Sequence, residues 1–432
     1  MAIALASAIL TAHKSIFDHL DDVFDHVDGI FGPKNTFLAI MALKAAGRTV
    51  NYREVLKEMH QEWQWLGWNS TPSAGALSKA RVNLDVEDCR EVWQAAVSKA
   101  RAVMPPNEDL LEGRRIIAFD ASRVVSPNTA GARKLWGRPT TKNGVNHHNP
   151  QPMMVAAWEL TTGIPIDIAL LEYRGSERRG AMTLIDALNA SDVAVFDRGY
   201  HGRDFFGKFM EKGIDIVARM TTGGGKAWKE VAAFLKSGEE DAVVDMEVGD
   251  RIEKVRLIRR KFPRGAPKKG QTRDRMVIFT TLLDAKSFPI DKLIALYAKR
   301  WDIETRFREI KITYGLESFH STRVDGIEQE IYAVLTWMTL AAMVDHLAQV
   351  EMEKERGPQD WMDPARWQTR RTDVFSVTRR LFFAVLVDPR STIDHLIALA
   401  QGEAEWIATG ARRRAPGRSF ERITKSPWGR WK

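Results

Sequence analysis

The sequence predicts an α/β protein in which a core of strands and helices lies between helical segments at the two ends of the chain. Residues 1 to about 110 have a mainly helical pattern of apolar residues, with breaks at Gly32-Pro33, Gly47 and 68–72. From residue 115, short apolar runs typical of strands alternate with helical segments, and a helical pattern returns after Glu330. The chain has 432 residues, 44% of them hydrophobic, which is enough for about two to four domains with cores of their own.

Two helices are predicted within the N-terminal segment, at residues 54–66 and 73–82. Thr71 and Pro72, which stand between them, suit the N-cap and the first position of the second helix. Two helices joined in this way resemble a helix-turn-helix unit, and the second one includes Lys79 and Arg81. A helical bundle without contacts to bases has the same pattern, and the sequence leaves both interpretations open.

The predicted elements of the core follow one another in the order strand, strand, strand, helix, strand, helix, strand. The strands are at residues 116–120, 153–159, 164–171, 193–197 and 215–218, and the first helix is near 179–188. This is the order of an RNase H-like fold, whose mixed sheet places acidic residues at adjacent strand ends. We therefore expect residues 111–219 to form the first part of an RNase H-like core.

Two of the predicted strands end in an aspartate. Asp120 closes the apolar run 116–119, and Asp197 closes the run 193–196. A single aspartate at a strand end is usually a turn residue or a helix cap. Carboxylate oxygens from adjacent strand ends are also the ligands that Mg²⁺ prefers, and a pair of ions needs acids on both flanks. The two aspartates are therefore candidate metal ligands, provided that a third acid joins them.

The third acid is Glu304, which follows Asp197 by more than a hundred residues. A direct connection of that length is uncommon in a compact domain, so we expect an insertion at residues 220–288. Strand-like alternations within it predict a β-rich segment, and they surround a basic turn rich in glycine and proline; the alternations are at 242–247, 251–258 and 276–281, and the turn is at 262–271. The core then resumes at residues 289–345.

The segment around Glu304 predicts one helix with a polar and an apolar stripe. At about 100° per residue, four polar side chains fall within roughly 60° of one another, namely Tyr297, Arg300, Glu304 and Lys311. The neighbouring apolar stripe consists of Leu296, Ile303, Phe307 and Ile310. A phenol, a guanidinium, a carboxylate and an ammonium on one face suit a surface that holds phosphates beside a metal-binding acid.

These residues resemble the DDE transposases of bacterial insertion sequences, and specifically the insertion-sequence family 4 group. The hallmark of that group is Tyr, two residues, Arg, three residues, Glu, six residues, Lys, which matches Tyr297, Arg300, Glu304 and Lys311. The group's second motif, Asp-Arg-Gly-Tyr, stands at 197–200, and its first, an aspartate closing an apolar strand, stands at Asp120. Ala121-Ser122 follows Asp120 in place of Gly-Thr. The resemblance covers roughly residues 35 to 345.

The resemblance implies a cut-and-paste DNA transposase. Asp120, Asp197 and Glu304 would be its catalytic residues and would bind two Mg²⁺ ions, for which Mn²⁺ can substitute. Its partners would be double-stranded DNA, both the terminal inverted repeats and the target, and a second copy of the chain in the DNA complex. Two alternatives stay open: a domesticated DNA-binding protein without catalysis, and another RNase H-like DNA nuclease.

Candidate DNA contacts are cations and aromatic residues that lie beside the predicted acids, in a basic loop at 133–142, or in the N-terminal segment. They are Tyr297, Arg300, Trp301, Lys311, Arg198, Tyr200, Lys134, Arg138, Lys79 and Arg81. Each has a structural alternative, because tyrosines and tryptophans also fill cores and cations also face solvent. Residues 1–110 are accordingly expected to form a helical DNA-binding domain.

The composition fits a protein with a polyanionic partner. The formal net charge is +8 and the pI is about 9.4. Positive charge gathers at 251–275 and in a tail at 411–432, which follows a predicted helical domain at 346–410. The single cysteine, Cys89, excludes an internal disulfide and a cysteine-based zinc site, which fits a reducing cytoplasm. The apolar stretch 331–344 is too short to span a membrane and predicts a buried helix.

Overall fold

The structure is a computed structural model that describes most of the chain. The described residues are 2–23, 30–46, 50–62, 66, 68–106, 110–140, 143–223, 227–261, 275–363, 366–387 and 393–413. The basic turn expected at 262–271 and nearly all of the tail expected at 411–432 lie outside them.

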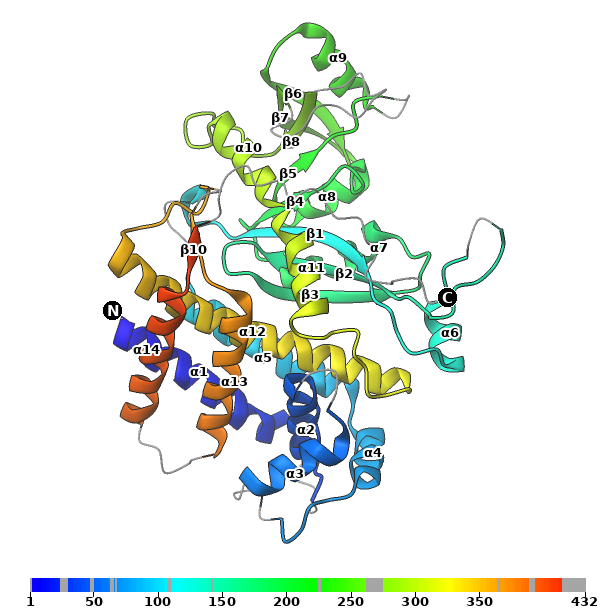
Figure 1. Cartoon of the computed structure of the whole chain (residues 1–432). Helices are drawn as coiled ribbons and strands as arrows, with labels where there is room; N and C mark the ends of the chain where they lie inside the picture. Colours follow the sequence, from blue (N-terminus) through cyan, green and yellow to red (C-terminus); the bar gives the residue numbers. More distant parts are fainter. Residues whose placement is uncertain are drawn as a thin grey trace, which may run out of the picture.

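A central sheet of eight strands organises the molecule (Figure 1). Its strands are β1 (Ile116–Arg123), β2 (Met153–Glu159), β3 (Ile164–Leu171), β4 (Val193–Phe196), β5 (Asp215–Arg219), β6 (Asp241–Val248), β7 (Arg251–Lys261) and β8 (Arg275–Thr280). They are arranged in the order β3-β2-β1-β4-β5-β8-β7-β6. The β1–β2 and β2–β3 pairs are antiparallel, and the β1–β4 and β4–β5 pairs are parallel. The strands expected from the sequence are therefore present, and they form one mixed sheet.

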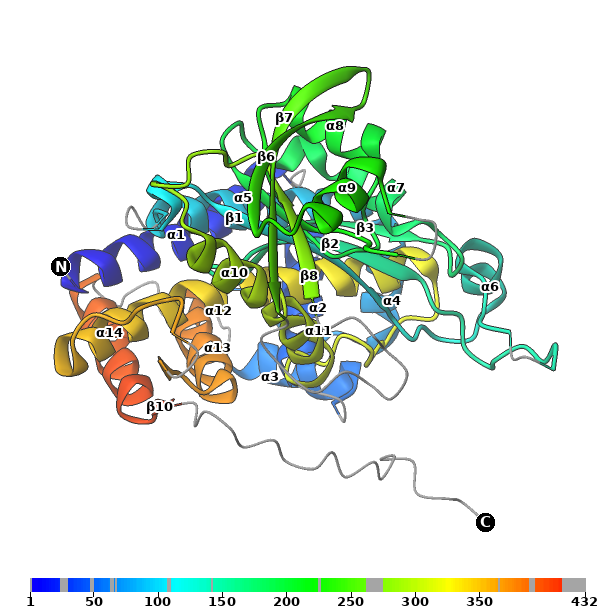
Figure 2. The same cartoon turned by 90° about the horizontal axis from the view of Figure 1, so that it is seen from above.

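The segment 220–288 extends this sheet. β8 pairs with β5 in antiparallel orientation, β7 pairs with β8, and β6 pairs with β7. The helix α9 (Lys229–Ser237) packs against β6 and β7. Figure 2 views the molecule from the end at which this segment lies. The strands expected here are thus hydrogen-bonded into the main sheet.

Part of the positive charge in this segment serves the fold. Arg256 is 1% exposed, and its Nε and Nη2 donate to the two carboxylate oxygens of Asp241 at 2.8 and 2.7 Å. Arg259 is also buried, and its guanidinium donates to backbone carbonyls at Leu235 and Gly238. Buried arginines with such partners satisfy internal acceptors, so the charge cluster at 251–275 does not belong entirely to the surface.

Helices cover the sheet and continue into a large helical layer. Beside the sheet lie α6 (Ala130–Trp136), α7 (Glu177–Thr183), α8 (Arg203–Glu211), α10 (Ile290–Lys299) and α11 (Asp302–Ile312), with short 3₁₀ turns at Leu111–Gly113 and Ile185–Ala187. The helical layer contains α1 (Ala2–Val23), α2 (Pro33–Ala46), α3 (Tyr52–Glu62), α4 (Ala74–Asn83), α5 (Val86–Val103), α12 (Val324–Arg356), α13 (Arg371–Val387) and α14 (Ile393–Thr409). A two-stranded sheet joins β9 (Trp367–Gln368) to β10 (Arg412–Arg413).

The long helix α12 unites the two ends of the chain. It packs against α1, α2 and α5 from the N-terminal part and against α13 and α14 from the C-terminal part, and α5 and α12 both contact β3 (Figure 1). Within the described residues, α12 is the one helix long and apolar enough to cross a membrane, but 94% of its apolar window is buried inside the protein. The buried helix expected at 331–344 is therefore confirmed as the central part of α12.

The start of α4 differs from the sequence prediction. Ser73, and not Thr71, is the N-cap, because the Ser73 hydroxyl accepts a hydrogen bond from the Ala76 N–H at 3.1 Å. Pro72 consequently precedes the cap and is not the first helical residue. A serine at this position satisfies one of the free N–H groups of the first turn.

Arg81 of α4 lies in a buried polar network and not on a surface. It is 5% exposed, and its guanidinium donates to the Tyr52 hydroxyl at 2.5 Å, the Gly326 carbonyl at 2.6 Å and the Glu330 carboxylate at 3.0 Å. Burial alone would raise the pKa of Glu330, but the His320 hydrogen bond and the charges of Arg81 and Lys44 lower it to about 2. The prediction of Arg81 as a DNA contact is therefore wrong, because its donors are used inside the protein.

Replacing Arg81 by methionine should destabilise the fold strongly. Arg81→Met leaves the Glu330 carboxylate buried without its main cation, and breaking a buried ion pair in this way costs about 3–5 kcal/mol. Lys79→Met is the matched control, because Lys79 is exposed on the same helix and its loss should change the free energy of unfolding by less than about 0.5 kcal/mol. Urea unfolding of both variants measures the difference. Equal stabilities would contradict the structural role of Arg81.

Candidate active site

Asp120 and Asp197 lie at the same edge of the sheet. β1 and β4 are parallel neighbours, with Ala118 of β1 paired to Val195 of β4, and each aspartate comes two residues after its paired residue. The preceding side chains, Phe119 and Phe196, stack with ring centroids 5.0 Å apart, and both are fully buried. This aromatic contact fixes the two strand ends, because a buried ring pair in a packed core has little freedom to move.

A tight turn follows Asp197. The Asp197 Oδ1 accepts a hydrogen bond from the Gly199 N–H at 2.7 Å, and a Cβ on Gly199 would lie 3.0 Å from the same oxygen. Tyr200 then turns back into the core, where it is 0% exposed and packs against Phe196. Its hydroxyl is buried without a hydrogen-bond partner among the described residues. The prediction of Tyr200 as a DNA contact is corrected accordingly, because the protein covers this side chain.

The helix expected around Glu304 is two helices. α10 ends at Lys299 and α11 begins at Asp302, and Arg300 and Trp301 lie between them. At the junction the Arg300 N–H donates to the Tyr297 carbonyl at 3.1 Å, and the Ile303 N–H donates to the Arg300 carbonyl at 3.1 Å. These bonds span three residues instead of four, which tightens the turn and interrupts the α-helix.

The expected apolar stripe is confirmed. Leu296, Ile303 and Ile310 are fully buried, and Phe307 is 5% exposed. The Phe307 ring packs edge-to-face on Trp158 of β2 with centroids 5.9 Å apart, and α11 also contacts β1. The apolar face of α11 therefore holds the helix that bears Glu304 against the strand that bears Asp120.

Arg300 connects two of the three acids. Its guanidinium is 3.8 Å from Asp120 Oδ2 through Nη1 and 3.8 Å from Glu304 Oε1 through Nη2. The Arg300 side chain is 7% exposed, whereas Glu304 is 45% exposed. The rings of Tyr297 and Trp301 lie 5.9 and 5.3 Å from the guanidinium carbon. Asp120 and Glu304 thus meet at a shared buried cation.

The electrostatic surroundings of Asp120 disfavour its charged form. Burial raises the pKa of Asp120 to about 6, and the charges of Asp197 and Glu177 add to the increase. The hydrogen bond from the Ala121 N–H, at 2.9 Å, and the charge of Arg300 only partly offset this. Burial and the neighbouring acids therefore outweigh the effect of Arg300 on the pKa of Asp120.

Glu177 is an acid of this site that sequence reasoning missed. It occupies the first turn of α7, after the N-cap Ser176, and although the residue is exposed, partial desolvation followed by the charge of Asp197 raises its pKa. The neighbouring Arg178 donates to the His201 carbonyl at 3.3 Å, which places the start of α7 against the turn after Asp197. The only signal in the sequence was an acid at the start of the helix between the third and fourth strands.

These residues fit a hard divalent cation. The acceptors are carboxylate oxygens, Asp120 lacks compensating charge, and the buried Tyr200 hydroxyl has a free hydrogen-bonding position. Among the described residues, no group of three or more His, Cys, Asp or Glu side chains is close enough to hold an ion as arranged. Asp120 and Glu304 lie next to Arg300, and the acids do not converge on one point.

Lys311, the last residue of the sequence signature, is engaged within the protein. Its ammonium donates to the Arg123 carbonyl at the end of β1 and lies 3.4 Å from Glu317 Oε1. The Lys311 side chain is 25% exposed. The structure therefore shows Lys311 bonded to β1, whereas the sequence predicted a contact with a phosphate.

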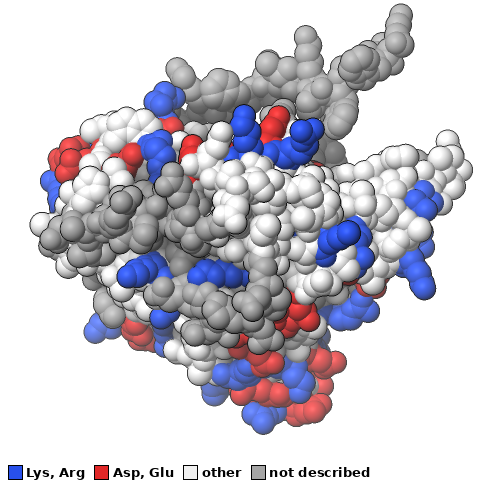
Figure 3. Space-filling model, turned by 90° about the horizontal axis from the view of Figure 1, so that it is seen from below, with Lys and Arg blue, Asp and Glu red and all other residues white. Residues whose placement is uncertain are grey.

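The remaining predicted DNA contacts lie at different depths. Trp301 is 55% exposed, Arg198, Lys134 and Lys79 are exposed, Arg138 is half-buried, and Tyr297 is buried. Lys134 belongs to α6, which lies beyond the sheet at one side of the molecule (Figure 1). On the face in Figure 3, Lys and Arg side chains form several separate groups with Asp and Glu between them. This face has no continuous basic surface among its described residues.

Acids at neighbouring strand ends, with a further acid on a helix packed against the same sheet, are the arrangement expected of a DDE enzyme. The family model described as "Transposase DDE domain" matches residues 111–340, more than half of the chain, and the chain belongs to this family. It is 26% identical over 287 residues to "Transposase InsG for insertion sequence element IS4" of Escherichia coli (strain K12). The match covers 63% of this chain and 62% of that relative, so it spans less than two thirds of the relative's length. The expected kinship with the insertion-sequence family 4 group is confirmed.

A solved structure is also similar, at greater distance. It is the "Cryo-EM structure of piggyBac transposase synaptic complex with hairpin DNA (SNHP)", 10% identical, with a TM-score of 0.46 over 96% of this chain and 86% of that chain. A likeness this distant supports no conclusion about the site.

Replacing Asp120 by asparagine should stabilise the metal-free protein at high pH. The folded-state pKa of about 6 lies above the ordinary value of 3.8, so the folded state binds this proton more tightly than the unfolded state. Below about pH 4, Asp120 is protonated in both states and the free energy of unfolding is unaffected. From about pH 4 to 6 its ionisation progressively lowers the free energy of unfolding, by about 1–3 kcal/mol in total. Asp120→Asn should remove this cost, as measured by urea unfolding with a chelator at several pH values.

Asp291→Asn is the control for this measurement, because Asp291 is 96% exposed. It should show no gain that depends on pH. A gain for Asp120→Asn that is equal at all pH values, or no gain at about pH 8, would contradict the account of the Asp120 environment.

Proposed function

We propose that this protein is a cut-and-paste DNA transposase that binds transposon ends, cleaves them with two divalent metal ions and transfers the 3′ ends to target DNA. The observation that supports it most is that Asp120 and Asp197 stand at the ends of adjacent parallel strands, while Arg300 lies between Asp120 and Glu304. The strand order β3-β2-β1-β4-β5 supports an RNase H-like core. In it β3, β2 and β1 pair in antiparallel orientation, and β4 and β5 continue the sheet parallel to β1.

Asp120, Asp197 and Glu304 would hold the ions, which we propose to be Mg²⁺ with Mn²⁺ as a substitute. When bound, such ions supply an activated water for cleavage and stabilise the departing oxygen of the DNA strand. Asp120 favours cation binding because its carboxylate is buried and near other acids. The Tyr200 hydroxyl is buried without a hydrogen-bond partner among the described residues, so it would be free to bond to one of the carboxylates when the ions are bound.

Arg300 would hold the acids together until DNA is bound. Its 3.8 Å separations from Asp120 and Glu304 are longer than direct hydrogen bonds, and its Nε is buried without a partner among the described residues. A guanidinium with an unused donor can bind an oxygen of a phosphate. We propose that Arg300 turns from the carboxylates to the phosphate next to the cut when DNA is bound. Bound cations would then neutralise the carboxylates in its place.

Exposed and half-buried side chains, at this edge and elsewhere on the molecule, would bind the DNA itself. Trp301 is 55% exposed next to Arg300, which suits stacking on a base near the cut end. Arg198, Lys134, Arg138 and Lys79 would contact phosphates, and binding should weaken steeply with salt because such contacts release counterions. Two transposon ends must be held together for the reaction, so we propose that the active complex contains two copies of the chain.

A catalytically silent DNA-binding protein is the alternative. The environment of Asp120 argues against it, because a buried carboxylate with a raised pKa destabilises the fold at neutral pH. Such a cost is typical of residues kept for chemistry. A protein that only binds DNA would gain nothing from the loss of stability that the buried Asp120 carboxylate causes.

Loss of any one of the three acids should abolish cleavage. Asp120→Ala, Asp197→Ala and Glu304→Ala should each lower the rate on a duplex carrying the end of the element that encodes the chain, in Mg²⁺, by at least about 10²-fold. Binding of that duplex should change little, because the acids do not contact phosphates directly. Asp291→Asn, at an exposed position on α10, is the control and should cleave normally. Cleavage by Asp120→Ala or Glu304→Ala at the normal rate would refute the proposal.

Loss of the exposed tryptophan should weaken binding to frayed DNA ends. Trp301→Ala should cost about 1 kcal/mol or more for a duplex with a single-stranded overhang, about a fivefold rise in Kd, because stacking is lost. Trp406→Ala is a matched control, since Trp406 is 52% exposed on the distant helix α14. Fluorescence anisotropy at one fixed salt concentration measures both. An equal effect of the two substitutions would show that Trp301 does not stack on DNA.

A further inference from the structure

We infer that Glu317, in the loop 313–323 between α11 and α12, is a positioning residue that fixes the helix bearing Glu304 to the strand bearing Asp120. The inference goes beyond the roles assigned to the acids and rests on the proposed function for its effect on catalysis. It follows from contacts on both sides of the loop.

Glu317 contacts both acid-bearing elements with one carboxylate oxygen. Its Oε1 accepts a hydrogen bond from the Val125 N–H, just after β1, at 3.0 Å and lies 3.4 Å from the Lys311 ammonium of α11. Lys311 also donates to the Arg123 carbonyl, so α11, the loop and β1 close a ring of polar contacts. Asp120 precedes this ring on β1, and Glu304 lies about two turns before Lys311 on α11.

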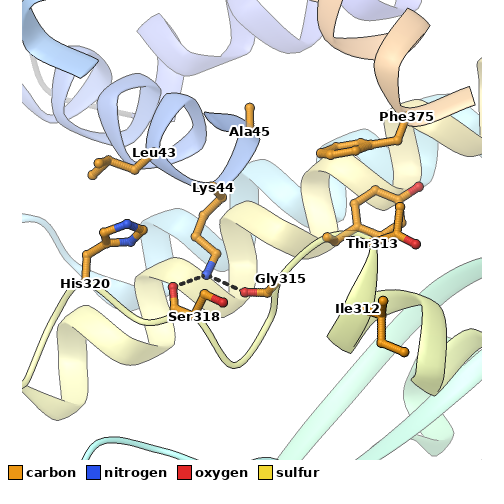
Figure 4. Close-up of a pocket in the computed structure, with 10 residues that line it drawn as sticks. Leu43, Lys44, Ala45, Ile312, Thr313, Gly315, Ser318, His320 and Phe375 are labelled. Carbon is orange, nitrogen blue, oxygen red and sulfur yellow. Dashed lines mark hydrogen bonds between the residues drawn. The ribbon is translucent and has the colours of Figure 1, made fainter. Parts of the chain in front are cut away.

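The loop itself is held from its other side by the N-terminal helices. The Lys44 ammonium of α2 donates to the Gly315 carbonyl at 3.0 Å and to the Ser318 carbonyl at 2.9 Å, on either side of Glu317 (Figure 4). Lys44 is 4% exposed and lies 3.6 Å from the buried Glu330. Glu330 in turn accepts the backbone N–H groups of His320 and Ser321.

Hydrogen bonds and packing together determine the path of this loop, whose Tyr314 and Leu316 side chains are buried in the core. A pocket of about 150 Å³ borders it, lined by Lys44, Thr313 and Phe375 among others (Figure 4). Gly315 has a φ of 61°, in the left-handed region that favours glycine, and it lies in the turn that follows α11 and its C-cap Thr313. The buried side chains of Tyr314 and Leu316 and the two hydrogen bonds from Lys44 therefore hold the backbone that carries Glu317.

A positioning role follows from these contacts. Glu317 and Lys311 are 26% and 25% exposed, so their pairing is less screened by water than that of a surface pair. Weakening it would let α11 and the end of β1 move relative to each other. A displacement of about 1 Å between groups that share a reaction centre can cost about 10²-fold in rate.

The test compares Glu317→Gln with Asp325→Asn. The glutamine keeps an acceptor for the Val125 N–H but loses the charge that attracts Lys311. Asp325 is 53% exposed next to the same loop and pairs with Arg323, so Asp325→Asn removes a surface ion pair that touches neither α11 nor β1. Both changes are at partly or fully exposed positions, and both proteins should fold. Glu317→Ala, which loses both contacts, gives the larger perturbation.

Three measurements separate positioning from a general loss of stability. Glu317→Gln should raise the Kd for Mn²⁺, added as the only ligand, by about 10-fold, and lower the cleavage rate at saturating DNA by about 10-fold. Its unfolding midpoint in a chelator should match that of Asp325→Asn. Hydrogen exchange of the amides of α11 and of Val125 should be about 10-fold faster in Glu317→Ala than in the wild type.

The outcomes distinguish this inference from the proposed function. Wild-type protein that neither cleaves DNA nor binds Mn²⁺ would refute the proposed function, and hydrogen exchange would still decide whether Glu317 fixes α11 to β1. Unchanged exchange in Glu317→Ala would overturn the inference. Mn²⁺ affinity and cleavage rate equal to those of Asp325→Asn, in a protein that is active, would overturn it as well.

Discussion

The buried guanidinium of Arg300 is the interaction on which the arrangement of the acids depends. Two like charges about 4 Å apart repel each other by about 4 kcal/mol near a protein surface, so carboxylates do not gather without compensation. Arg300 supplies it by lying 3.8 Å from both Asp120 and Glu304, although the two acids are far apart in the sequence. Burial outweighs this contribution at Asp120, whose pKa is raised to about 6.

Apolar contacts beneath the acids hold this charged arrangement in place. The Phe119–Phe196 stack fixes the ends of β1 and β4, and the Phe307–Trp158 contact fixes α11 on the sheet. Farther out, the helices from both chain ends pack around α12, and the Glu330 network joins α2, α4 and α12 to the loop after α11. The active-site edge is therefore supported from the core and from the helical layer at once.

The sequence predicted those parts of the fold that depend on local pattern. The strands, the strand-end aspartates and the apolar stripe of α11 follow from short apolar runs and from helical spacing, and the structure contains them. The break at Arg300 escaped prediction because both junction residues keep helical backbone angles, and only the hydrogen-bond spacing changes. The burial of Arg81 escaped it because its partner, Glu330, is 249 positions away. The β5–β8 pairing and the place of Glu177 near the acids also escaped prediction. Both depend on residues that are neighbours only in the folded protein, which no local pattern encodes.

The central claim is that Asp120, Asp197 and Glu304 form one centre for divalent cations when DNA is bound. A structure of the protein with a terminal DNA duplex and Mn²⁺, in which anomalous scattering locates the metal, tests this most directly. The account predicts Mn²⁺ between the carboxylates of Asp120 and Asp197, with Glu304 in contact with a metal ion and Arg300 turned toward a phosphate. Mn²⁺ bound elsewhere, or Glu304 remaining on Arg300 and away from the metal with the DNA end in place, would contradict it.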